Sequence, residues 1–513
     1  MPVPGRTRRP DRDPRVCGAG SAKALALVGA MVVFANATAQ TVTVRPSVDA
    51  RLTFTDNSSA SGEKKADWIG EVSPAIVISR DRGRISGNLN ARLRNTAHAS
   101  DSDRNATFVA LQGLGQIEAV ERTFFVDMGA TISRNNRSGL TGRASEDFLG
   151  TDSANETRLF SIGPRLHFRL GSETQGVVSY AFRWFDGGGA TVRRTVGDWR
   201  GQLSNPLAFG RVGWALDYSR TDSSYDDAAN NEVSEETARA SLLFSVTPQL
   251  RLRGIVGHES NDYSVRSGES DDITGMGFDW YPTDRTVVSG ATENRIFGRG
   301  YNLSVSHRQA LSVWNVSFSR DISSSLQTTG SVFDDPAFRS LFDALAGEIP
   351  DPFDREAFVR QQLGYPAPGV RDAFVTNNFF LARVLRASVS LRGVRNVLTF
   401  ALQSSERSRL GSPLVSDPRD DLSSFDTVST ESGTVALSHS LSPLATMNAS
   451  FVRSRSSGSG PSRAHTNRNL LSVGISTRLG PDTTGGLTYR FQQADGASDF
   501  TENVLTANIG MQF

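Results

Sequence analysis

The sequence predicts an all-β protein: one large antiparallel β-barrel of about 22 strands that crosses an outer membrane. Three observations lead to this prediction: an export leader at the amino terminus, alternating apolar and polar residues along most of the remaining chain, and connections that are short and long in turn. The composition agrees with a barrel, in which only the outward face is apolar, because only 38% of the 513 residues are hydrophobic. No run of about 20 apolar residues occurs from which a membrane-spanning helix would form.

The first 39 residues have the order of features that defines a secretory signal peptide. Five arginines lie within residues 6–15, a 12-residue apolar stretch covers 24–35, and small residues at 37–39 complete the pattern. The apolar stretch is too short to cross a bilayer. We therefore expect the leader, residues 1–39, to be removed on export, and residues 40–513 to form a single barrel domain.

Charge and cysteine content exclude several other classes of protein. With 55 basic and 54 acidic residues, the formal net charge of +1 gives no basic field that would hold nucleic acid. The one cysteine, Cys17, precedes the apolar stretch of the leader, so it cannot accept the lipid of a lipoprotein. The mature chain would contain no cysteine, and we expect neither disulfides nor thiolate metal sites.

Apolar and polar residues alternate from residue 42 onward. Residues 42–55 read VTVRPSVDARLTFT, residues 85–94 read ISGNLNARLR, and residues 160–169 read FSIGPRLHFR. Successive side chains of a strand point to opposite faces, so each segment forms a strand with one apolar and one polar face. Strands of about 10–14 residues exceed the 5–6 residues usual in soluble sheets and suit a tilted membrane span.

The connections between these strands alternate in length. Short ones such as 80–83 and 171–174 alternate with long polar ones such as 56–65. Short turns on one rim and long loops on the other are typical of membrane barrels, whereas a soluble sandwich has no reason to keep this order. We count 22 strands, an even number that places both chain ends at the short-turn rim. The segments 194–205 and 300–309 alternate least clearly, which leaves a range of 20 to 24 strands.

The carboxyl terminus has the pattern of a strand that is read by the outer-membrane assembly machinery. Apolar residues occupy every second position at Ile509, Met511 and Phe513, and the chain ends on the aromatic residue. We therefore expect these three residues to act as the assembly signal and the assembly machinery to be a partner of the chain.

One connection, residues 323–376, is much longer than the others. Within it, residues 336–346 and 352–363 have apolar side chains at helical spacing. Strand parity places this segment on the long-loop, extracellular side. Two interpretations remain open: a surface loop with a small core of its own, or a segment whose apolar face folds into the mouth of the barrel and constricts the pore.

The polar face of the predicted strands is rich in basic residues. Nine of them have the parity of lumen-lining positions: Arg92, Arg94, Arg165, His167, Arg169, Arg183, Arg239, Arg251 and Arg253. A barrel of 20 or more strands is wide enough to hold water or a plug. Inward arginines either pair with carboxylates such as Asp127 and Glu118, or form a track for an anionic or polyhydroxylated solute whose oxygen atoms accept their hydrogen bonds.

Motifs of known catalytic and metal sites are absent from the sequence. No G-x-S-x-G, H-E-x-x-H, phosphate-binding loop or C-x-x-C pattern occurs, and the six histidines are scattered. His439 has the outward parity that a barrel-embedded hydrolase would need, but the serines around it are common throughout the strands. We expect no enzymatic activity, no catalytic residues, no cofactor and no metal site.

Several stretches of the mature chain have a more specific pattern. They include residues 44–57 and 71–76 near the start, GFDWYPT at 277–283, and ENVLTA at 502–507 before the final Phe513. In this order they resemble the PEP-CTERM system-associated outer-membrane protein family, over nearly the whole mature chain. The resemblance implies an outer-membrane barrel in bacteria that make exopolysaccharide and carry an exosortase sorting system, and it supplies no catalytic residues.

These patterns predict a protein of the Gram-negative outer membrane, in contact with its lipid. The resemblance implies an export pore or assembly component of an exopolysaccharide or exosortase system, with the polymer or periplasmic export components as partners. Two alternatives remain open: a general diffusion porin, and a closed barrel with a structural or docking role.

Overall fold

The computed structural model describes most of the chain from residue 42 to the end. The described residues are 42–80, 82–136, 138, 140, 154–188, 193–226, 231–262, 269–323, 338, 341–343, 345, 355–356, 359, 376–411, 420–497 and 499–513. The predicted leader, residues 1–39, lies outside them, as do most residues of the 323–376 segment.

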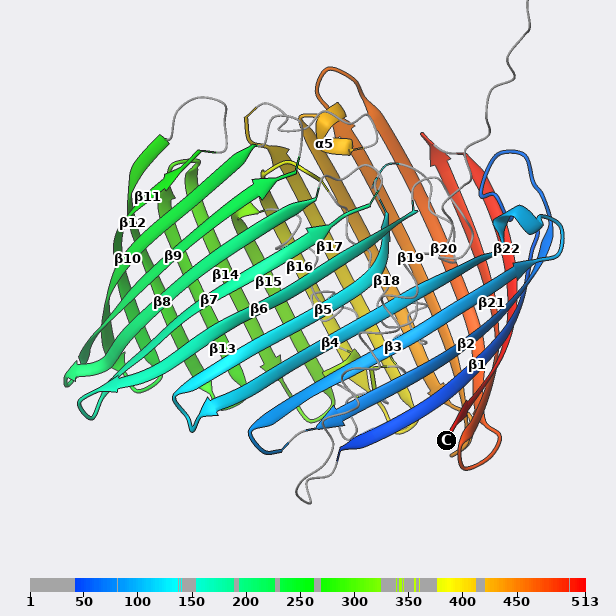
Figure 1. Ribbon diagram of the computed structural model, residues 1–513, viewed down its shortest axis with the longest axis horizontal. Coiled ribbons are helices and arrows are strands. Elements are labelled where there is room, and N and C mark those ends of the chain that lie inside the picture. The colour runs from blue at the N-terminus through cyan, green and yellow to red at the C-terminus, as the bar shows by residue number, and fades with distance from the viewer. Residues whose placement is uncertain are drawn as a thin grey trace, which may run out of the picture. The chain divides into compact units, whose positions relative to one another are not determined.

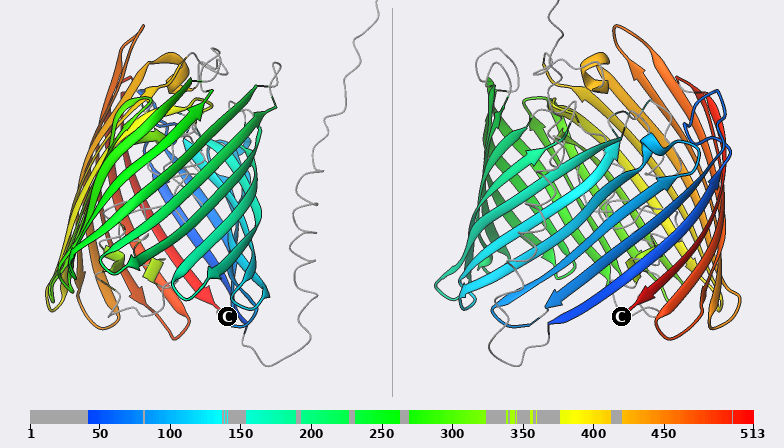
Figure 2. Two further views of the ribbon diagram at one scale, coloured as in Figure 1. Left: turned by 90° about the vertical axis from the view of Figure 1, so that its left-hand side faces the viewer. Right: turned by 45° about the vertical axis from the view of Figure 1, so that its right-hand side comes forward.

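Twenty-two antiparallel strands form one closed sheet (Figure 1). Each strand pairs with the next one in the sequence, and β1 pairs with β22, so the sheet closes on itself without a free edge. The predicted fold class and strand count are therefore confirmed. The strands are inclined along the wall (Figure 2), as closure of a sheet into a barrel requires.

The strands are 10 to 17 residues long. Their bounds are β1 (Thr43–Thr55), β2 (Asp67–Arg80), β3 (Ile85–His98), β4 (Ala106–Val120), β5 (Phe124–Asn136), β6 (Ala154–Leu170), β7 (Thr174–Asp186), β8 (Arg194–Phe209), β9 (Val212–Tyr225), β10 (Glu232–Thr247), β11 (Leu250–Asn261), β12 (Glu269–Thr283), β13 (Thr286–Arg295), β14 (Gly298–Arg308), β15 (Ser312–Ser323), β16 (Phe380–Arg392), β17 (Asn396–Arg409), β18 (Thr427–Ser440), β19 (Ala445–Ser459), β20 (Ala464–Arg478), β21 (Thr483–Gly496) and β22 (Phe500–Gln512).

The two rims of the barrel differ in the length of their connections. The short connections include 171–173, 248–249 and 284–285. The start of β1 and the carboxyl end of the chain lie at this rim, and the carboxyl end is marked there in Figure 1. The opposite rim carries longer connections, with the short helices η1 (Ser102–Arg104) and α5 (Asp421–Ser424).

One connection on the long-loop rim departs from this order. Strands β13 and β14 are joined there by only two residues, Ile296 and Phe297. Gly298 follows with a φ of 90°, a backbone conformation that glycine adopts without the steric cost of a side chain. Since β13 and β14 are also the shortest strands, this hairpin makes a low point in the rim.

The two segments with the least clear alternation are both strands. The predicted 194–205 lies within β8, and the predicted 300–309 corresponds to β14. The pairing of β8 with β9 shifts register between Asn205 and Phe209. Pro206 lies in this interval and has no N–H to donate to a ladder, which explains both the irregular pattern and the bulge.

Buried apolar side chains in the described part of the chain form small separate clusters instead of one continuous core. This agrees with a barrel, whose apolar residues mostly face outward. Within the described ranges, no helix is both long and apolar enough to cross a membrane.

Candidate functional site

The two faces of the barrel wall differ in chemistry. On β2, Val72 is 52% exposed, whereas its neighbours Glu71 and Ser73 are buried. On β17, Leu402 is 63% exposed, whereas Ala401 is buried against another part of the chain. The apolar residues therefore face outward and the polar residues line the lumen, which is the arrangement of a barrel surrounded by lipid.

Aromatic side chains gather on the outward face of β6, β7 and β8. The ring centroids of Tyr180 and Trp199 lie 4.6 Å apart, and those of Phe160 and Trp184 lie 5.6 Å apart. Rings with a polar atom and an apolar body suit the boundary between lipid and water. The outer face of these strands therefore has the chemistry expected near a membrane interface.

All nine basic residues singled out from the sequence lie on the lumenal face of their strands, opposite the exposed apolar side chains. Six of them form ion pairs with carboxylates on the same face: Arg92–Asp49 at 2.9 Å, Arg94–Glu71 at 2.9 Å, Arg165–Asp127 at 2.8 Å, Arg183–Asp198 at 2.9 Å, Arg239–Glu293 at 3.2 Å and Arg253–Asp279 at 3.5 Å. The wall is therefore a ladder of paired charges along much of the barrel. That these residues line a path for solute stays a prediction.

Of the two carboxylates proposed as partners of the arginines, one has that role. Asp127 pairs with Arg165, whose guanidinium also lies over the ring of Phe125. Glu118 instead accepts a hydrogen bond from the backbone N–H of Arg122, in the turn that follows its strand. Sequence parity identifies the face of a side chain but not its neighbour on the next strand.

The pair formed by Arg94 and Glu71 is the most enclosed of the six. The side chains are 4% and 5% exposed. Arg94 donates from Nε to Oε1 of Glu71 at 3.0 Å and from Nη2 to Oε2 at 2.9 Å, while the hydroxyl of Ser73 donates to Oε1 at 2.6 Å. A forked pair with its lone pairs satisfied in this way holds strands β2 and β3 in register.

A second enclosed network lies below the short β13–β14 hairpin, and the sequence pattern did not predict it. Arg295, at the end of β13, is 5% exposed and donates from Nη2 to Oε2 of Glu259 at 2.6 Å. Oε1 of Glu259 accepts from the backbone N–H of Ile296 at 2.7 Å. Glu293 connects this pair to Arg239 on β10. The parity of β13 indicates an inward Arg295, but nothing in the sequence indicates its partner 36 residues away.

The three remaining predicted lumen residues have other surroundings. The ring of His167 packs edge-on against Phe125, with 5.2 Å between the centroids. Arg251 lies directly across from Asp279, the carboxylate that pairs with Arg253. Arg169 lies near the short-turn rim and is exposed. Among the described residues, neither Arg169 nor Arg251 forms an ion pair.

Part of the long segment 323–376 packs against the lumenal face of the wall. Phe338, Leu341, Leu345 and Val359 of this segment form one buried apolar cluster with Val397 and Ala401 of β17 and Ala436 of β18. Val397 is the second residue of β17, directly after a short connection, so the cluster lies close to the short-turn rim. The segment starts and ends at the opposite rim, where β15 ends and β16 begins. The described residues of the cluster therefore lie deep in the lumen, far from the rim at which the segment starts and ends.

Two further contacts cross the mouth at the long-loop rim. Leu140, between β5 and β6, is buried, and its carbonyl accepts a hydrogen bond from the hydroxyl of Thr466 at the start of β20. Phe379, directly before β16, forms an apolar cluster with Tyr225 of β9 and Val233 of β10. Several strands of the ring separate the elements joined in each case, so Leu140 and Phe379 each contact a distant part of the rim.

Asp420 binds the residues that follow the long segment, directly before β16. Its carboxylate accepts hydrogen bonds from the hydroxyl of Thr376 at 2.8 Å and from the backbone N–H groups of Asn377 at 3.1 Å and Leu422 at 3.0 Å. Burial raises the pKa of Asp420 above its usual value, although these hydrogen bonds act in the opposite direction. The contacts tie the start of β16 to α5 at the mouth.

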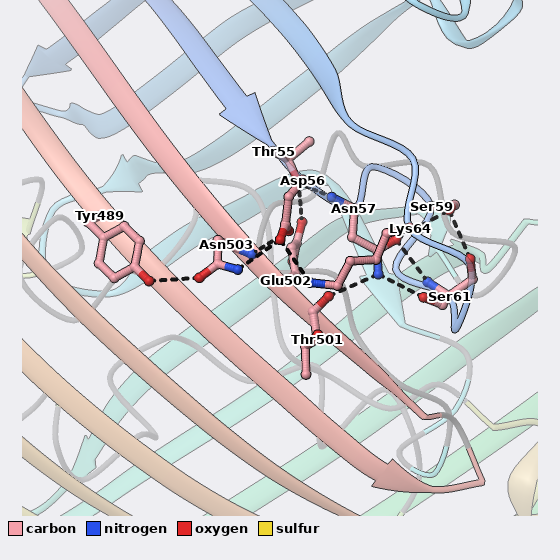
Figure 3. A network of polar contacts seen from close by, with 10 residues as sticks. All are labelled: Thr55, Asp56, Asn57, Ser59, Ser61, Lys64, Tyr489, Thr501, Glu502 and Asn503. Atoms are coloured by element: carbon pink, nitrogen blue, oxygen red, sulfur yellow. Dashed lines mark hydrogen bonds and ion pairs between the residues drawn. The ribbon is translucent and has the colours of Figure 1, made fainter.

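The seam between the first and last strands is closed by side chains as well as by the backbone ladder (Figure 3). At the long-loop end, the hydroxyl of Thr55 donates to Glu502 at 3.1 Å, and the amide of Asn57 donates to the carbonyl of Thr501 at 3.0 Å. The loop after β1 is thereby attached to β22, more than 440 residues later in the chain.

Groups that would suit a metal or hydrolase site are not brought together in the described ranges. No group of three or more histidine, cysteine, aspartate or glutamate side chains is placed to hold a metal ion there. His439, considered above as a hydrolase residue, shares a hydrogen bond between Nδ1 and Oδ1 of Asn396 at 2.5 Å. The candidate site is therefore the lumen, with its paired charges and the segment packed inside it.

No protein-family model matches the chain, and no curated protein matches it. Solved structures match its fold. The FrpB iron transporter from Neisseria meningitidis is 9% identical, with a TM-score of 0.51 for the F3-3 variant and 0.50 for the apoprotein form of the F5-1 variant. Both comparisons cover 91% of this chain and 81% of that chain. The ferric enterobactin receptor PfeA from Pseudomonas aeruginosa is 10% identical, with a TM-score of 0.48 over 93% of this chain and 81% of that chain. At such identities the likeness concerns the fold alone, which is that of outer-membrane barrels.

Proposed function

We propose that this protein is an outer-membrane channel whose lumen is narrowed by its own segment 323–376. The observation that carries the proposal is the apolar cluster in which Phe338, Leu341 and Val359 of this segment pack on the lumenal wall near the short-turn rim. An apolar surface exposed to a water-filled lumen would be unfavourable, and packing on the wall removes it from water. The segment is thus held where it obstructs passage.

The width of the barrel supports the same proposal. The wall side chains of a barrel with 22 strands cannot fill its interior, so the lumen holds either water or inserted chain. Among the described residues, six of the nine predicted lumen residues are paired with carboxylates, so most of these nine charges already have a partner on the wall. A polar wall with paired charges around an inserted segment suits a regulated passage better than an open diffusion porin.

The cellular role proposed for this channel is export in an exopolysaccharide or exosortase system. This role rests on the resemblance of residues such as 44–57 and 277–283 to the PEP-CTERM system-associated family. Deleting the gene should then reduce exopolysaccharide at the cell surface while the polymer accumulates inside the cell. Unchanged surface polymer would contradict the export role but leave the channel proposal standing.

A pair of single substitutions tests the channel itself. Leu341→Asp places a charge in the apolar cluster and should release the segment from the wall, because an unpaired buried charge is strongly unfavourable. Leu341→Met keeps an apolar side chain of similar volume and serves as the matched control. In planar bilayers, Leu341→Asp should show larger or more frequent openings than the wild type, and Leu341→Met should not. No openings in any of the three proteins would favour a closed barrel with a structural or docking role.

A further inference from the structure

Three arginines occupy neighbouring positions on the outward face of the barrel at the long-loop end. Arg299 lies on β14, Arg320 on β15 and Arg383 on β16, and the register pairs Arg320 directly with Arg383 and with Tyr301, two residues after Arg299. Arg299 and Arg383 are exposed and Arg320 is half-buried. We call these three residues the arginine triad. It lies beside the β13–β14 hairpin.

No carboxylate in the described part of the chain pairs with Arg299, Arg320 or Arg383 of this triad. Among the described residues, neither Arg299 nor Arg383 forms an ion pair, although Glu406 is the cross-strand partner of Arg383. Arg320 donates to the backbone carbonyls of Phe297 and Arg299 at the tip of the hairpin. Like charges directly opposite each other on neighbouring strands are destabilising. The guanidinium of Arg320 lies over the ring of Phe297 at 5.5 Å and that of Arg383 over the ring of Phe318 at 5.8 Å. An anion bound beside these two groups would therefore stabilise the pair.

Two other outward arginines at the same end of the barrel have carboxylate partners. Arg158 on β6 pairs with Glu156 at 2.6 Å, and Arg220 on β9 pairs with Asp222 at 3.0 Å. In both cases the carboxylate lies two residues away on the same strand. Strands β14, β15 and β16 have no carboxylate two residues from these arginines, so the triad differs from Arg158 and Arg220 in this respect.

Directly below the triad the outer face becomes aromatic and then aliphatic. The rings of Tyr301 and Phe318 are stacked with 4.6 Å between their centroids. Leu303 and Leu385 follow on β14 and β16 and are 37% and 40% exposed. A ligand that covers both zones needs an anionic head and apolar chains, which is the chemistry of a lipid and not of a free anion.

We propose that the arginine triad binds the phosphate groups of a phosphorylated glycolipid in the outer leaflet of the membrane. Guanidinium groups bind phosphate oxygens through two parallel hydrogen bonds, and arginines near an anionic lipid surface add favourable electrostatic attraction. The acyl chains would lie along the apolar strip formed by Phe318, Leu303 and Leu385. The proposal requires that the barrel lie in the membrane with its long loops outside, but not that its lumen conduct.

Lipid binding by the purified full-length protein tests this site. The probe is bisphosphorylated lipid A added to the protein in detergent micelles, with the bound lipid counted by native mass spectrometry. The double variant Arg320→Gln/Arg383→Gln should bind lipid A about 30-fold more weakly than the wild type, which corresponds to the loss of two arginine–phosphate contacts. The matched control, Arg158→Gln/Arg220→Gln, removes two outward arginines that already have carboxylate partners and should bind as the wild type does. Equal losses in the two double variants would overturn the proposal.

Three further measurements distinguish a phosphorylated lipid from a free anion. Dephosphorylated lipid A should bind weakly to the wild type, and equal binding of both lipids would overturn the role of phosphate. Inorganic phosphate at millimolar concentration should not displace the lipid; displacement would identify a free-anion site instead. Arg320→Lys/Arg383→Lys keeps the charge and loses the forked geometry, so it should bind with intermediate affinity, and it replaces the glutamine variant if that variant fails to fold. Bilayer conductance should be unchanged in these variants, so failure of the lipid site is distinguishable from failure of the channel.

Discussion

Asn503 of β22 donates two hydrogen bonds to the carboxylate of Asp56, which directly follows β1. The backbone N–H of Asn503 lies 2.7 Å from Oδ1 of Asp56, and its side-chain amide lies 2.8 Å from Oδ2 (Figure 3). Lys64 adds a third donor to Oδ2 at 2.9 Å. These contacts join the first and last strands at the long-loop end, where the barrel closes.

We expect Asp56→Ala to destabilise the closed barrel by about 2 to 3 kcal/mol, because it removes hydrogen bonds to a charged group at the seam. The measurement is the free energy of unfolding in guanidinium, followed by tryptophan fluorescence in lipid vesicles. Lys64→Met, which removes one exposed ion pair, is the control and should change the stability by less than about 1 kcal/mol. Equal stability of Asp56→Ala and the wild type would contradict a closing role for this contact.

The same carboxylate gives the barrel a dependence on pH. Burial of Asp56 acts to raise its pKa, but the hydrogen bonds from Asn503 and Lys64 outweigh burial, so the pKa lies below the usual value of 3.8. A carboxyl group with a lowered pKa stabilises the folded barrel when the pH is above the group's usual pKa. This stabilisation is lost as the pH falls through the lowered pKa. The stability difference between the wild type and Asp56→Asn should therefore be constant above about pH 5 and shrink below about pH 4. A difference that does not change with pH would show that the charge of Asp56 has no part in it.

Glu259 holds the two-residue hairpin between β13 and β14 through Arg295 and the N–H of Ile296. We expect Glu259→Gln to destabilise the barrel by about 3 to 5 kcal/mol, because it leaves the guanidinium of Arg295 buried without its main partner. The free energy of unfolding measures this effect. Asp279→Asn breaks the longer and more exposed pair with Arg253 and should cost less than about 1 kcal/mol. A smaller loss for Glu259→Gln than for Asp279→Asn would be inconsistent with this role of Glu259 in the hairpin.

Phe513 should matter for assembly more than for the stability of the finished barrel. Its ring is 69% exposed, and its backbone N–H donates to the carbonyl of Pro46 at 2.9 Å, a bond that any residue except proline can make. Phe513→Ala should therefore change the stability of refolded protein by less than about 0.5 kcal/mol. In cells it should lower the amount of heat-modifiable barrel in the outer membrane, whereas Gln512→Ala should not. Equal amounts in both variants would show that the terminal aromatic is not the assembly signal.

The fold could be predicted from the sequence because lipid-facing apolar residues and lumen-facing polar residues alternate along each barrel strand. Residues 85–94 alternate without interruption and lie in β3, and even the less regular 300–309 corresponds to β14. The bulge at Pro206 and the two-residue hairpin at 296–297 were not predicted, since each is a local exception to a period of two. To predict either feature, one must know which backbone groups pair between neighbouring strands.

The candidate site could be predicted only in part. Parity placed residues such as Arg94 and Arg165 on the lumenal side, because face follows directly from position in a strand. Their partners depend on the register between strands, which no single strand encodes, so Glu71 and Glu259 were missed. The sequence also predicts two helical stretches within 323–376, but not where their apolar faces pack. That depends on Val397 and Ala401 of the wall, which are distant in the sequence.

The most direct test of the channel is the single-channel conductance of the wild type and of a protein that lacks residues 325–372. Both would be purified, refolded and inserted into planar bilayers under the same salt conditions. If the segment packed on β17 and β18 narrows the lumen, the deletion should raise the conductance several-fold and lengthen the openings. An unchanged conductance in a correctly folded deletion variant would contradict the proposal that this segment controls passage through the barrel.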